Sequence, residues 1–162
     1  MTLPTTSIRT ATAVRLRDLL LLEPESSDVP VFVGWSGSVP TSDPYIVIYV
    51  GNDTGELERA ALSDARHLRD DRWTLDVVVV SAFTAADDAA EEMQRVENLA
   101  GVVQTVLAEN PVLMLEGNGL PGLIDCAART GFEGPGVAAN GGDGSQFIAG
   151  CLLTLYCRAR LS

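Results

Sequence analysis

The clearest pattern in this chain is an alternation of apolar with other residues between positions 147 and 161. Successive side chains of a β-strand point to opposite faces, so a period of two predicts a strand with one buried face. Because the pattern continues almost to residue 162, we expect this end of the chain to be held in a sheet. The apolar positions are Phe147, Ala149, Cys151, Leu153, Leu155, Cys157, Ala159 and Leu161.

A different period, with apolar residues three or four positions apart, predicts a helix over residues 84–109. Thr84 is its candidate N-cap, and Asn110 followed by proline ends it. Glu91 and Arg95 have the spacing of an ion pair on this helix. Acidic residues fill its first turns, where the helix dipole favours negative charge. These are Asp87, Asp88, Glu91 and Glu92, and the stripe that we expect to be buried is Met93, Val96, Leu99, Ala100, Val103, Val106 and Leu107.

Short apolar runs bounded by Gly, Pro or polar residues predict the other strands. Residues 52–71 are interpreted as a polar loop with a helical turn near residues 57–62, and residues 130–144 as a turn-rich loop. Val78 and Val80 make half of one strand apolar on both faces, which indicates cover on both sides or a neighbouring subunit. The predicted strands, besides the last one, span residues 31–33, 45–50, 72–83, 112–115 and 123–129.

A first helix is predicted over residues 11–22, with Thr10 or Thr12 as its cap and Pro24 beyond its end. Runs of strands with interposed helices are typical of an α+β fold. We therefore expect a largely antiparallel or mixed sheet, with this N-terminal helix and the long helix packed on one face. The length of 162 residues suits a single domain.

The chain is strongly acidic, with 22 Asp and Glu against 11 basic residues and a net charge of -11. All of the basic residues are arginine, which excludes lysine Schiff-base chemistry and the lysine of a phosphate-binding loop. The acidity also argues against duplex nucleic acid and anionic membranes as binding partners. Its simplest interpretation is a charge that keeps the protein soluble.

The cysteines, Cys126, Cys151 and Cys157, show no paired metal-binding or redox spacing. Cys151 and Cys157 fall on one strand, too far apart to bridge each other, and we interpret all three as small reduced core residues. No basic, apolar and cleavable leader begins the sequence, and no run has membrane-spanning length. We therefore expect the protein to be made in a cytoplasm and to stay there.

Two short motifs resemble catalytic or cofactor-binding signatures without meeting their requirements. Residues 34–38 place Ser36 in a Gly-Trp-Ser-Gly-Ser run, but a nucleophile elbow needs a final glycine and a following helix, and His67 has no matching acid motif. Residues 117–122 match Gly-x-Gly-x-x-Gly, yet Pro121 and the strand that follows do not allow the helix start that holds a pyrophosphate. We expect no enzymatic activity, no cofactor and no metal.

The candidate contact residues are charged or aromatic. Arg158 and Arg160 fall on the face of the last strand opposite its apolar positions, and in an acidic protein they are candidates for contacts with the acidic start of the long helix on an adjacent subunit. The members of that start are Asp87, Asp88, Glu91 and Glu92. Trp73 has the periodicity of a core residue, whereas Trp35, in a Gly- and Ser-rich loop, is an interface candidate.

The order of these elements resembles the tail terminator, or tail completion, proteins of long-tailed bacteriophages over nearly the whole chain. The pattern, size and order carry the resemblance, since none of the motifs is diagnostic alone. The runs that match are Ala13-Val14-Arg15-Leu16-Arg17, Val31-Phe32-Val33-Gly34, Pro44-Tyr45-Ile46-Val47, Trp73-Thr74-Leu75-Asp76-Val77 leading into the long helix, and Arg158-Ala159-Arg160. The loop over residues 131–144 is richer in glycine than the family leads one to expect.

This resemblance implies a structural protein of the virion, assembled in the host cytoplasm. Such proteins form a ring, usually of six subunits, that caps the completed tail tube and presents a surface to the head-side connector. The implied partners are other copies of the chain, the tail tube protein and the connector, with DNA only passing through the lumen. The loops over residues 52–71 and 131–144 are natural contact elements.

Three other functions remain open from the residues. A head-side neck or stopper protein would bind the portal side of the junction instead of the tube. A small enzyme would show a deep cleft lined by convergent polar groups. A cytoplasmic binding module would be monomeric at micromolar concentration.

Overall fold

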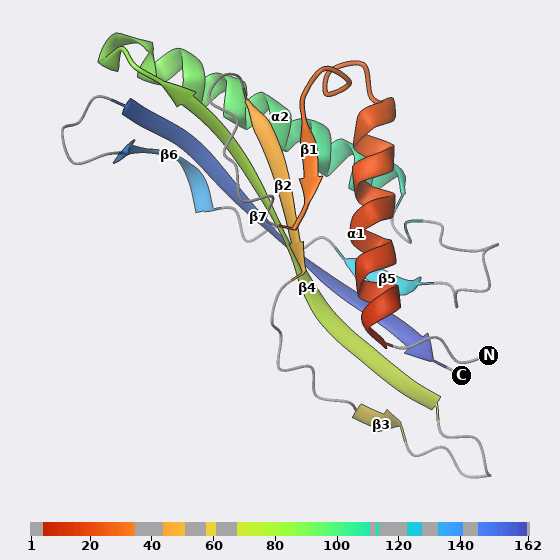
Figure 1. The fold of residues 1–162 in the computed structure, drawn as a ribbon. Helices are drawn as coiled ribbons and strands as arrows, with labels where there is room; N and C mark the ends of the chain where they lie inside the picture. Colours follow the sequence, from red (N-terminus) through yellow and green to blue (C-terminus); the bar gives the residue numbers. More distant parts are fainter. Residues whose placement is uncertain are drawn as a thin grey trace.

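The computed structural model describes residues 5–34, 44–50, 58–60, 68–110, 113, 123–127, 133–140 and 146–161. Within these residues, two α-helices and seven strands follow one another, with a 3₁₀ turn before the second helix (Figure 1). The elements are α1 Thr5–Leu22, β1 Val31–Val33, β2 Tyr45–Val50, β3 Glu58–Ala60, β4 Leu68–Phe83, the turn η1 Ala86–Asp88, α2 Ala89–Glu109, β5 Leu123–Ala127, β6 Glu133–Asn140 and β7 Gln146–Leu161.

The strands form one mixed sheet in the order β1-β2-β4-β7-β5, with β3 added to β4 and β6 added to β7. Only the β1–β2 pair is parallel among these described strands; the other pairs are antiparallel. Two 16-residue strands, β4 and β7, pair from Arg69 opposite Leu161 to Phe83 opposite Phe147. The predicted α+β fold is confirmed, and these two strands form a long ribbon through its centre (Figure 1).

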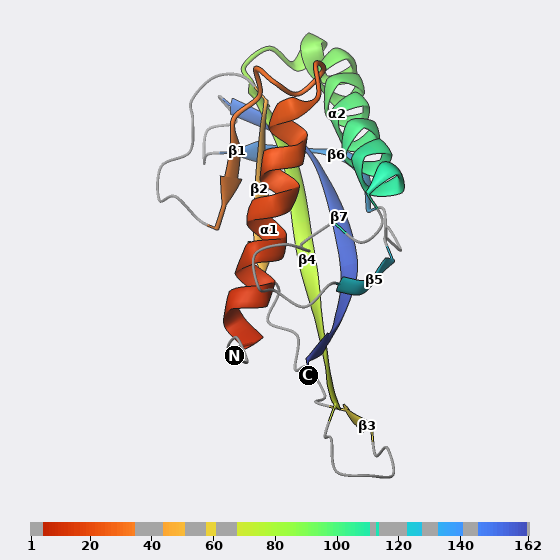
Figure 2. The same cartoon turned by 90° about the vertical axis from the view of Figure 1, so that its right-hand side faces the viewer.

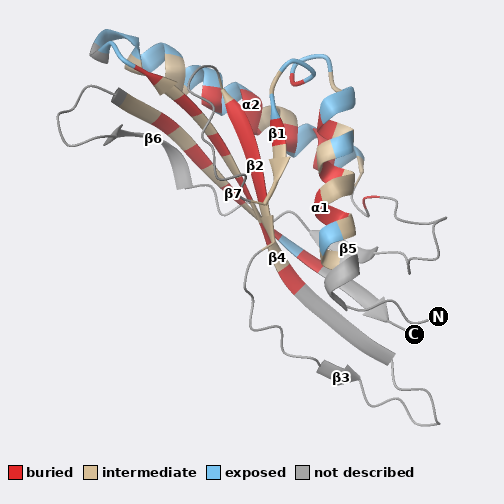
Figure 3. Ribbon diagram, viewed as in Figure 1, coloured by how far each residue is buried: buried red, intermediate tan, exposed pale blue. Residues whose placement is uncertain are grey.

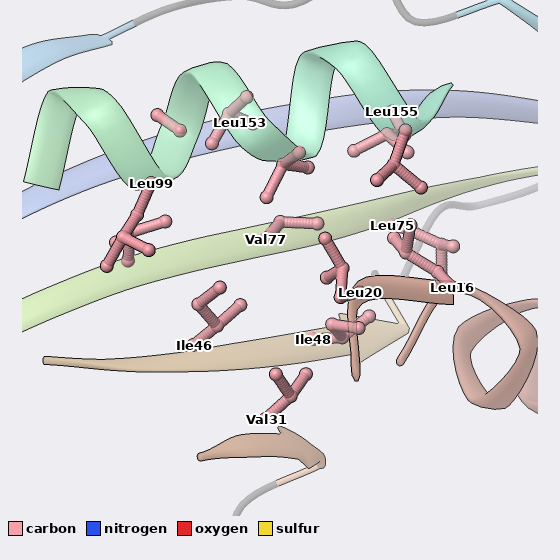
Figure 4. Packing of buried hydrophobic residues seen from close by; sticks show 14 of the residues in the cluster. Leu16, Leu20, Val31, Ile46, Ile48, Leu75, Val77, Leu99, Leu153 and Leu155 are labelled. Atoms are coloured by element: carbon pink, nitrogen blue, oxygen red, sulfur yellow. The ribbon is translucent and has the colours of Figure 1, made fainter. Parts of the chain in front are cut away.

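Both helices lie on the same side of the sheet (Figure 2). We call this side the inner face and the opposite side the outer face. Leu16 and Leu20 of α1 and Leu99 of α2 join one apolar cluster with alternate residues of the sheet (Figure 4). The fully buried sheet residues of this cluster are Ile46, Ile48, Trp73, Leu75, Val77, Val79, Ala149, Leu153 and Leu155.

Helix α1 begins at Thr5, six residues before the predicted start, and ends at Leu22 as predicted. Thr10 and Thr12 are therefore inside the helix, and the prediction that either caps it is wrong. The added first turns of the helix make a tertiary contact. The Arg9 guanidinium lies over the Trp73 ring, 5.9 Å from its centre, in a cation–π arrangement. After the end of the helix, the buried hydroxyl of Ser26 donates a hydrogen bond to the Leu20 carbonyl.

Helix α2 begins at Ala89, and Asp88 is its N-cap residue, so the prediction of Thr84 as cap is wrong. The three preceding residues form the 3₁₀ turn and separate Thr84 from the helix. The predicted end is confirmed, because the Asn110 N–H and its side-chain amide both donate to the Val106 carbonyl. The predicted stripe is buried except for Met93, which is half-buried against the core.

Four strands begin at or within one residue of the position that the sequence predicts. β1 and β2 have their predicted bounds, β7 begins one residue earlier, and β5 begins at the predicted residue 123. β4 begins at Leu68, four residues before the prediction, because its charged first residues pair with β3 and with the end of β7.

Three local predictions are wrong. Residues 58–60 form the strand β3 instead of a helical turn, and residues 133–140 form β6 inside the expected turn-rich loop. Leu113 is a turn residue with φ of 48°, which excludes a strand at this position. β3 pairs with β4 and β6 pairs with β7, and this pairing supplies backbone hydrogen bonds that no local sequence pattern reveals.

Candidate assembly surface

The outer face carries an apolar patch at the centre of the sheet. In backbone register, Val78 of β4 lies between Val47 of β2 and Leu152 of β7, and Val80 lies next to Tyr45. We define the outer patch as Tyr45, Val47, Val78, Val80, Ile148 and Leu152. Within the described part of the chain, neither helix packs on this face (Figures 2 and 3).

Burial differs across the outer patch. Tyr45 and Val47 are buried, at 8% and 6% exposed, whereas Val78, Val80 and Leu152 are half-buried. The Tyr45 ring meets the ring of Phe32 edge to face, with centroids 6.5 Å apart. Burial, together with the neighbouring Tyr49, raises the pKa of the Tyr45 hydroxyl. The patch thus presents apolar side chains that the protein itself covers only in part.

The outer face becomes polar toward the end of β7. The Thr154 hydroxyl donates a hydrogen bond of 3.0 Å to the Asp76 carboxylate directly opposite. Tyr156 follows on the same face, opposite Thr74, and is more than half exposed. An exposed tyrosine beside an apolar patch is typical of protein interfaces, which are enriched in aromatic residues.

The two predicted contact arginines occupy the end of the ribbon. In backbone register, Arg158 lies between Arg72 of β4 and Asp125 of β5, and Arg160 lies opposite Asp70. Opposite positions in an antiparallel pair are close enough for charges to interact. Asp70 and Asp125 of the same chain therefore compete with acidic residues of an adjacent subunit for contact with these arginines.

The predicted acidic cluster divides into two parts in the structure. Asp87, Asp88 and Glu91 are exposed at the start of α2. Glu92 is half-buried instead, because its carboxylate accepts a hydrogen bond from the hydroxyl of the buried Ser81 in β4. Arg95 lies 3.6 Å from Glu92, so the predicted pair of Glu91 with Arg95 is wrong and the i,i+3 pair takes its place.

The acidic start of α2 and the arginines near the end of β7 lie at opposite ends of the ribbon (Figure 1). Phe83, which leads into the start of α2, is 11 residues beyond Arg72, the backbone partner of Arg158. At about 3.3 Å per strand residue the two ends are roughly 35 Å apart. The two sets of charges cannot pair within one subunit, but they can meet if one copy stands next to another.

Of the two tryptophans, only Trp73 lies in the described part of the chain. Trp73 is 1% exposed, which confirms its predicted place in the core. Trp35, together with Ser36, His67 and most of the predicted contact loops, lies outside the described residues. In the described residues no three His, Cys, Asp or Glu side chains gather as a metal site would require, and neither helix is both long and apolar enough to cross a membrane.

Part of the outer patch was missed by the sequence reasoning, which named only Val78 and Val80. The signal was present in the uninterrupted apolar run of residues 45–50 and in Ile148 and Leu152, which break the polar alternation of the last strand. Apolar residues on both faces of adjacent strands are the mark of a sheet that is covered twice.

No protein-family model and no curated protein matches this chain. Several solved structures are similar to this chain, and one of them matches over 96% of this chain and 96% of its own, at 21% sequence identity and a TM-score of 0.51. Its name states no function. At this identity the similarity shows a common fold alone.

Proposed function

We propose that this protein is a tail terminator of a long-tailed bacteriophage. Its copies would form a ring, usually of six subunits in the family that it resembles, at the head-proximal end of the tail tube. The ring would stop tube growth and present the surface to which the head-side connector binds. The support comes from the order of elements in the sequence and from two features of the sheet.

The observation that carries the proposal is the outer patch. A sheet face whose central residues Val78, Val80 and Leu152 are only half-buried is unusual in a protein that acts alone, because contiguous apolar surface favours association. The inner face already has both helices as its cover. A second layer on the outer face, supplied by assembly, would bury these side chains as well.

The charges at the two ends of the ribbon support a head-to-tail contact. When a surface meets a different surface of the next copy, repeated contacts close into a ring if the rotation permits. Arg158 and Arg160 at one end and Asp87, Asp88 and Glu91 at the other would provide two such unlike surfaces. Each exposed pair contributes only about 0.2–1 kcal/mol, but a ring repeats it at every junction.

The net charge of -11 also suits a ring through which DNA passes. Phosphates are repelled by an acidic lumen, so DNA would slide without being held. This role needs no catalytic group, no cofactor and no metal ion.

Native mass spectrometry and negative-stain imaging of the full chain test the proposal, alone and mixed with the tail tube protein of the same phage. We expect closed rings that bind one end of the tube. A protein that stays monomeric both in solution and on the tube overturns the proposal. Rings that bind the portal-side connector and leave the tube free would assign the protein to the head side of the junction instead.

A further inference from the structure

The sheet brings together two cysteines that are 31 positions apart in the sequence. In the register of β5 with β7, Cys126 is the direct partner of Cys157. The neighbouring positions, Asp125 with Arg158 and Ala127 with Tyr156, follow in regular antiparallel order, so the cysteine pair lies beyond the irregularity near Leu123.

Directly opposite residues of an antiparallel pair have α-carbons about 4.5–5.5 Å apart. A disulfide requires α-carbons about 4.4–6.8 Å apart, so either kind of antiparallel position meets the requirement. Opposite residues also belong to the same face of a sheet, which is the second requirement of a bridge. The backbone register alone therefore meets the α-carbon spacing and the shared face that a disulfide requires.

We propose that Cys126 and Cys157 are a cross-strand thiol pair that closes to an intrachain disulfide and ties β5 to the central ribbon. Cys157 is 3% exposed, and β5 is the last strand in the sheet order, so the bond would anchor an edge strand to the core. Edge strands are the part of a sheet that opens most readily. This inference is independent of the proposed function.

The oxidant is a small disulfide such as oxidised glutathione. One cysteine thiolate attacks a glutathione sulfur, forms a mixed disulfide and releases one glutathione thiolate. The second cysteine thiolate then attacks the protein sulfur of that mixed disulfide, forms the Cys126–Cys157 bond and releases the second glutathione. The two protein thiols are oxidised, the glutathione disulfide is reduced, and the two protons pass to the glutathione thiols. A reducing cytoplasm would keep the pair open, and an oxidising medium would close it.

Cys151 is a matched control on the same strand. It is buried on the same face as Cys157, but its register partner on β4 is Val79, and β6, which pairs with the other edge of β7, contains no cysteine. Burial, with the nearby Glu97, raises the pKa of the Cys151 thiol, which makes it a poor nucleophile at neutral pH. We therefore expect it to remain a thiol while the pair closes.

The test is to treat the folded full chain with oxidised glutathione, unfold it, alkylate the remaining thiols and measure the intact mass and the peptides. We expect the chain to lose two hydrogen atoms and only Cys151 to be alkylated, with the Cys126 and Cys157 peptides linked. Cys151→Ala should close as the wild type does, whereas Cys126→Ser should keep a thiol or a glutathione adduct at Cys157. Three alkylated cysteines, a link that contains Cys151, or links between chains would each overturn the proposal.

Thermal unfolding provides a second measurement on the wild-type chain itself. A bridge that closes a loop of about 30 residues should raise the melting temperature by roughly 5–10 °C over the reduced protein. Cys126→Ala should melt at the same temperature in both conditions. An oxidised wild-type protein that melts no higher than the reduced one would contradict a bond formed in the native register.

Discussion

The two faces of the central ribbon carry similar side chains and meet different surroundings. Val77 and Val79 are fully buried on the inner face, while Val78 and Val80, their immediate neighbours, are half-buried on the outer face. All four are valines in one strand, so neither composition nor strand propensity distinguishes them. The helices distinguish them, because both pack on the inner face. Full burial of such a side chain stabilises a protein by about 1.5–3 kcal/mol. The half-buried valines of the outer face would therefore gain further free energy if another surface covered them.

The most damaging test replaces an inner-face contact of α2 with a charge. Leu99→Asp should unfold the protein, because an unpaired carboxylate in the apolar cluster costs several kcal/mol. The adjacent Asn98 is exposed, so Asn98→Asp is the control and should stay folded. Circular dichroism and urea titration measure both variants. A Leu99→Asp protein with wild-type stability would mean that the α2 stripe is not the cover of the inner face.

The sharpest test places the same charge on either side of one strand. Val77→Arg should unfold the protein, whereas Val78→Arg should leave the monomer folded and weaken self-association by roughly tenfold or more. Analytical ultracentrifugation of the folded variant measures the association. If Val78→Arg assembled as well as the wild type, the outer patch would not be the surface between subunits.

A smaller effect is expected from the polar groups of the two faces. Ser81→Ala removes the donor to Glu92 on the inner side and should cost about 1–3 kcal/mol in the free energy of unfolding, because a half-buried carboxylate loses its hydrogen bond from Ser81 and keeps only the ion pair with Arg95. Thr154→Val removes the bond to Asp76 on the outer face, where water can replace it, and should cost about 1 kcal/mol or less. Urea denaturation midpoints, with equal denaturant slopes, compare the unfolding free energies of the two variants. An equal loss would show that water is excluded from the outer-face hydrogen bond as much as from the inner one.

The smallest effect per contact concerns the charged ends of the ribbon. Reversal of both Arg158 and Arg160 to Glu should weaken ring formation, and Asp87→Arg with Asp88→Arg in the same chain should restore it if the contact joins two subunits. Restoration by Asp125→Arg and Asp70→Arg instead would assign the arginines to their register partners within the chain. Tail length by electron microscopy and ring mass give the readout.

The proposed role as a tail terminator adds a prediction of phenotype to the same variants, since a ring that fails to form would leave tail length uncontrolled. A double arginine reversal that assembles rings and tails as the wild type does would remove these residues from the function. It would leave the outer patch as the surface to test next, because the two surfaces are separated along the ribbon.

Local periodicity by itself determined the elements whose burial is one-sided and regular. The last strand and the buried stripe of α2 were predicted closely, because the covered face of each recurs with a period of 2 or 3.6 residues. β1 and β2 were predicted from short apolar runs that end at glycine, proline or polar residues. The acidic start and the asparagine end of α2 also act through local contacts, so the sequence shows them directly, although it placed the cap at the wrong residue.

Tertiary structure decided what depends on a partner far away in the chain. The sequence Glu-Gly-Pro-Gly-Val-Ala-Ala-Asn lacks the pattern of a strand, yet it forms β6 because β7 offers unpaired backbone groups beside it. The first residues of β4 are charged, and their pairing with β3 and β7 makes them a strand as well. The meeting of Cys126 with Cys157 and the separation of the acidic from the basic end follow from strand order. No local pattern encodes strand order, because it is set by which long-range pairings bury the most surface and satisfy the most backbone.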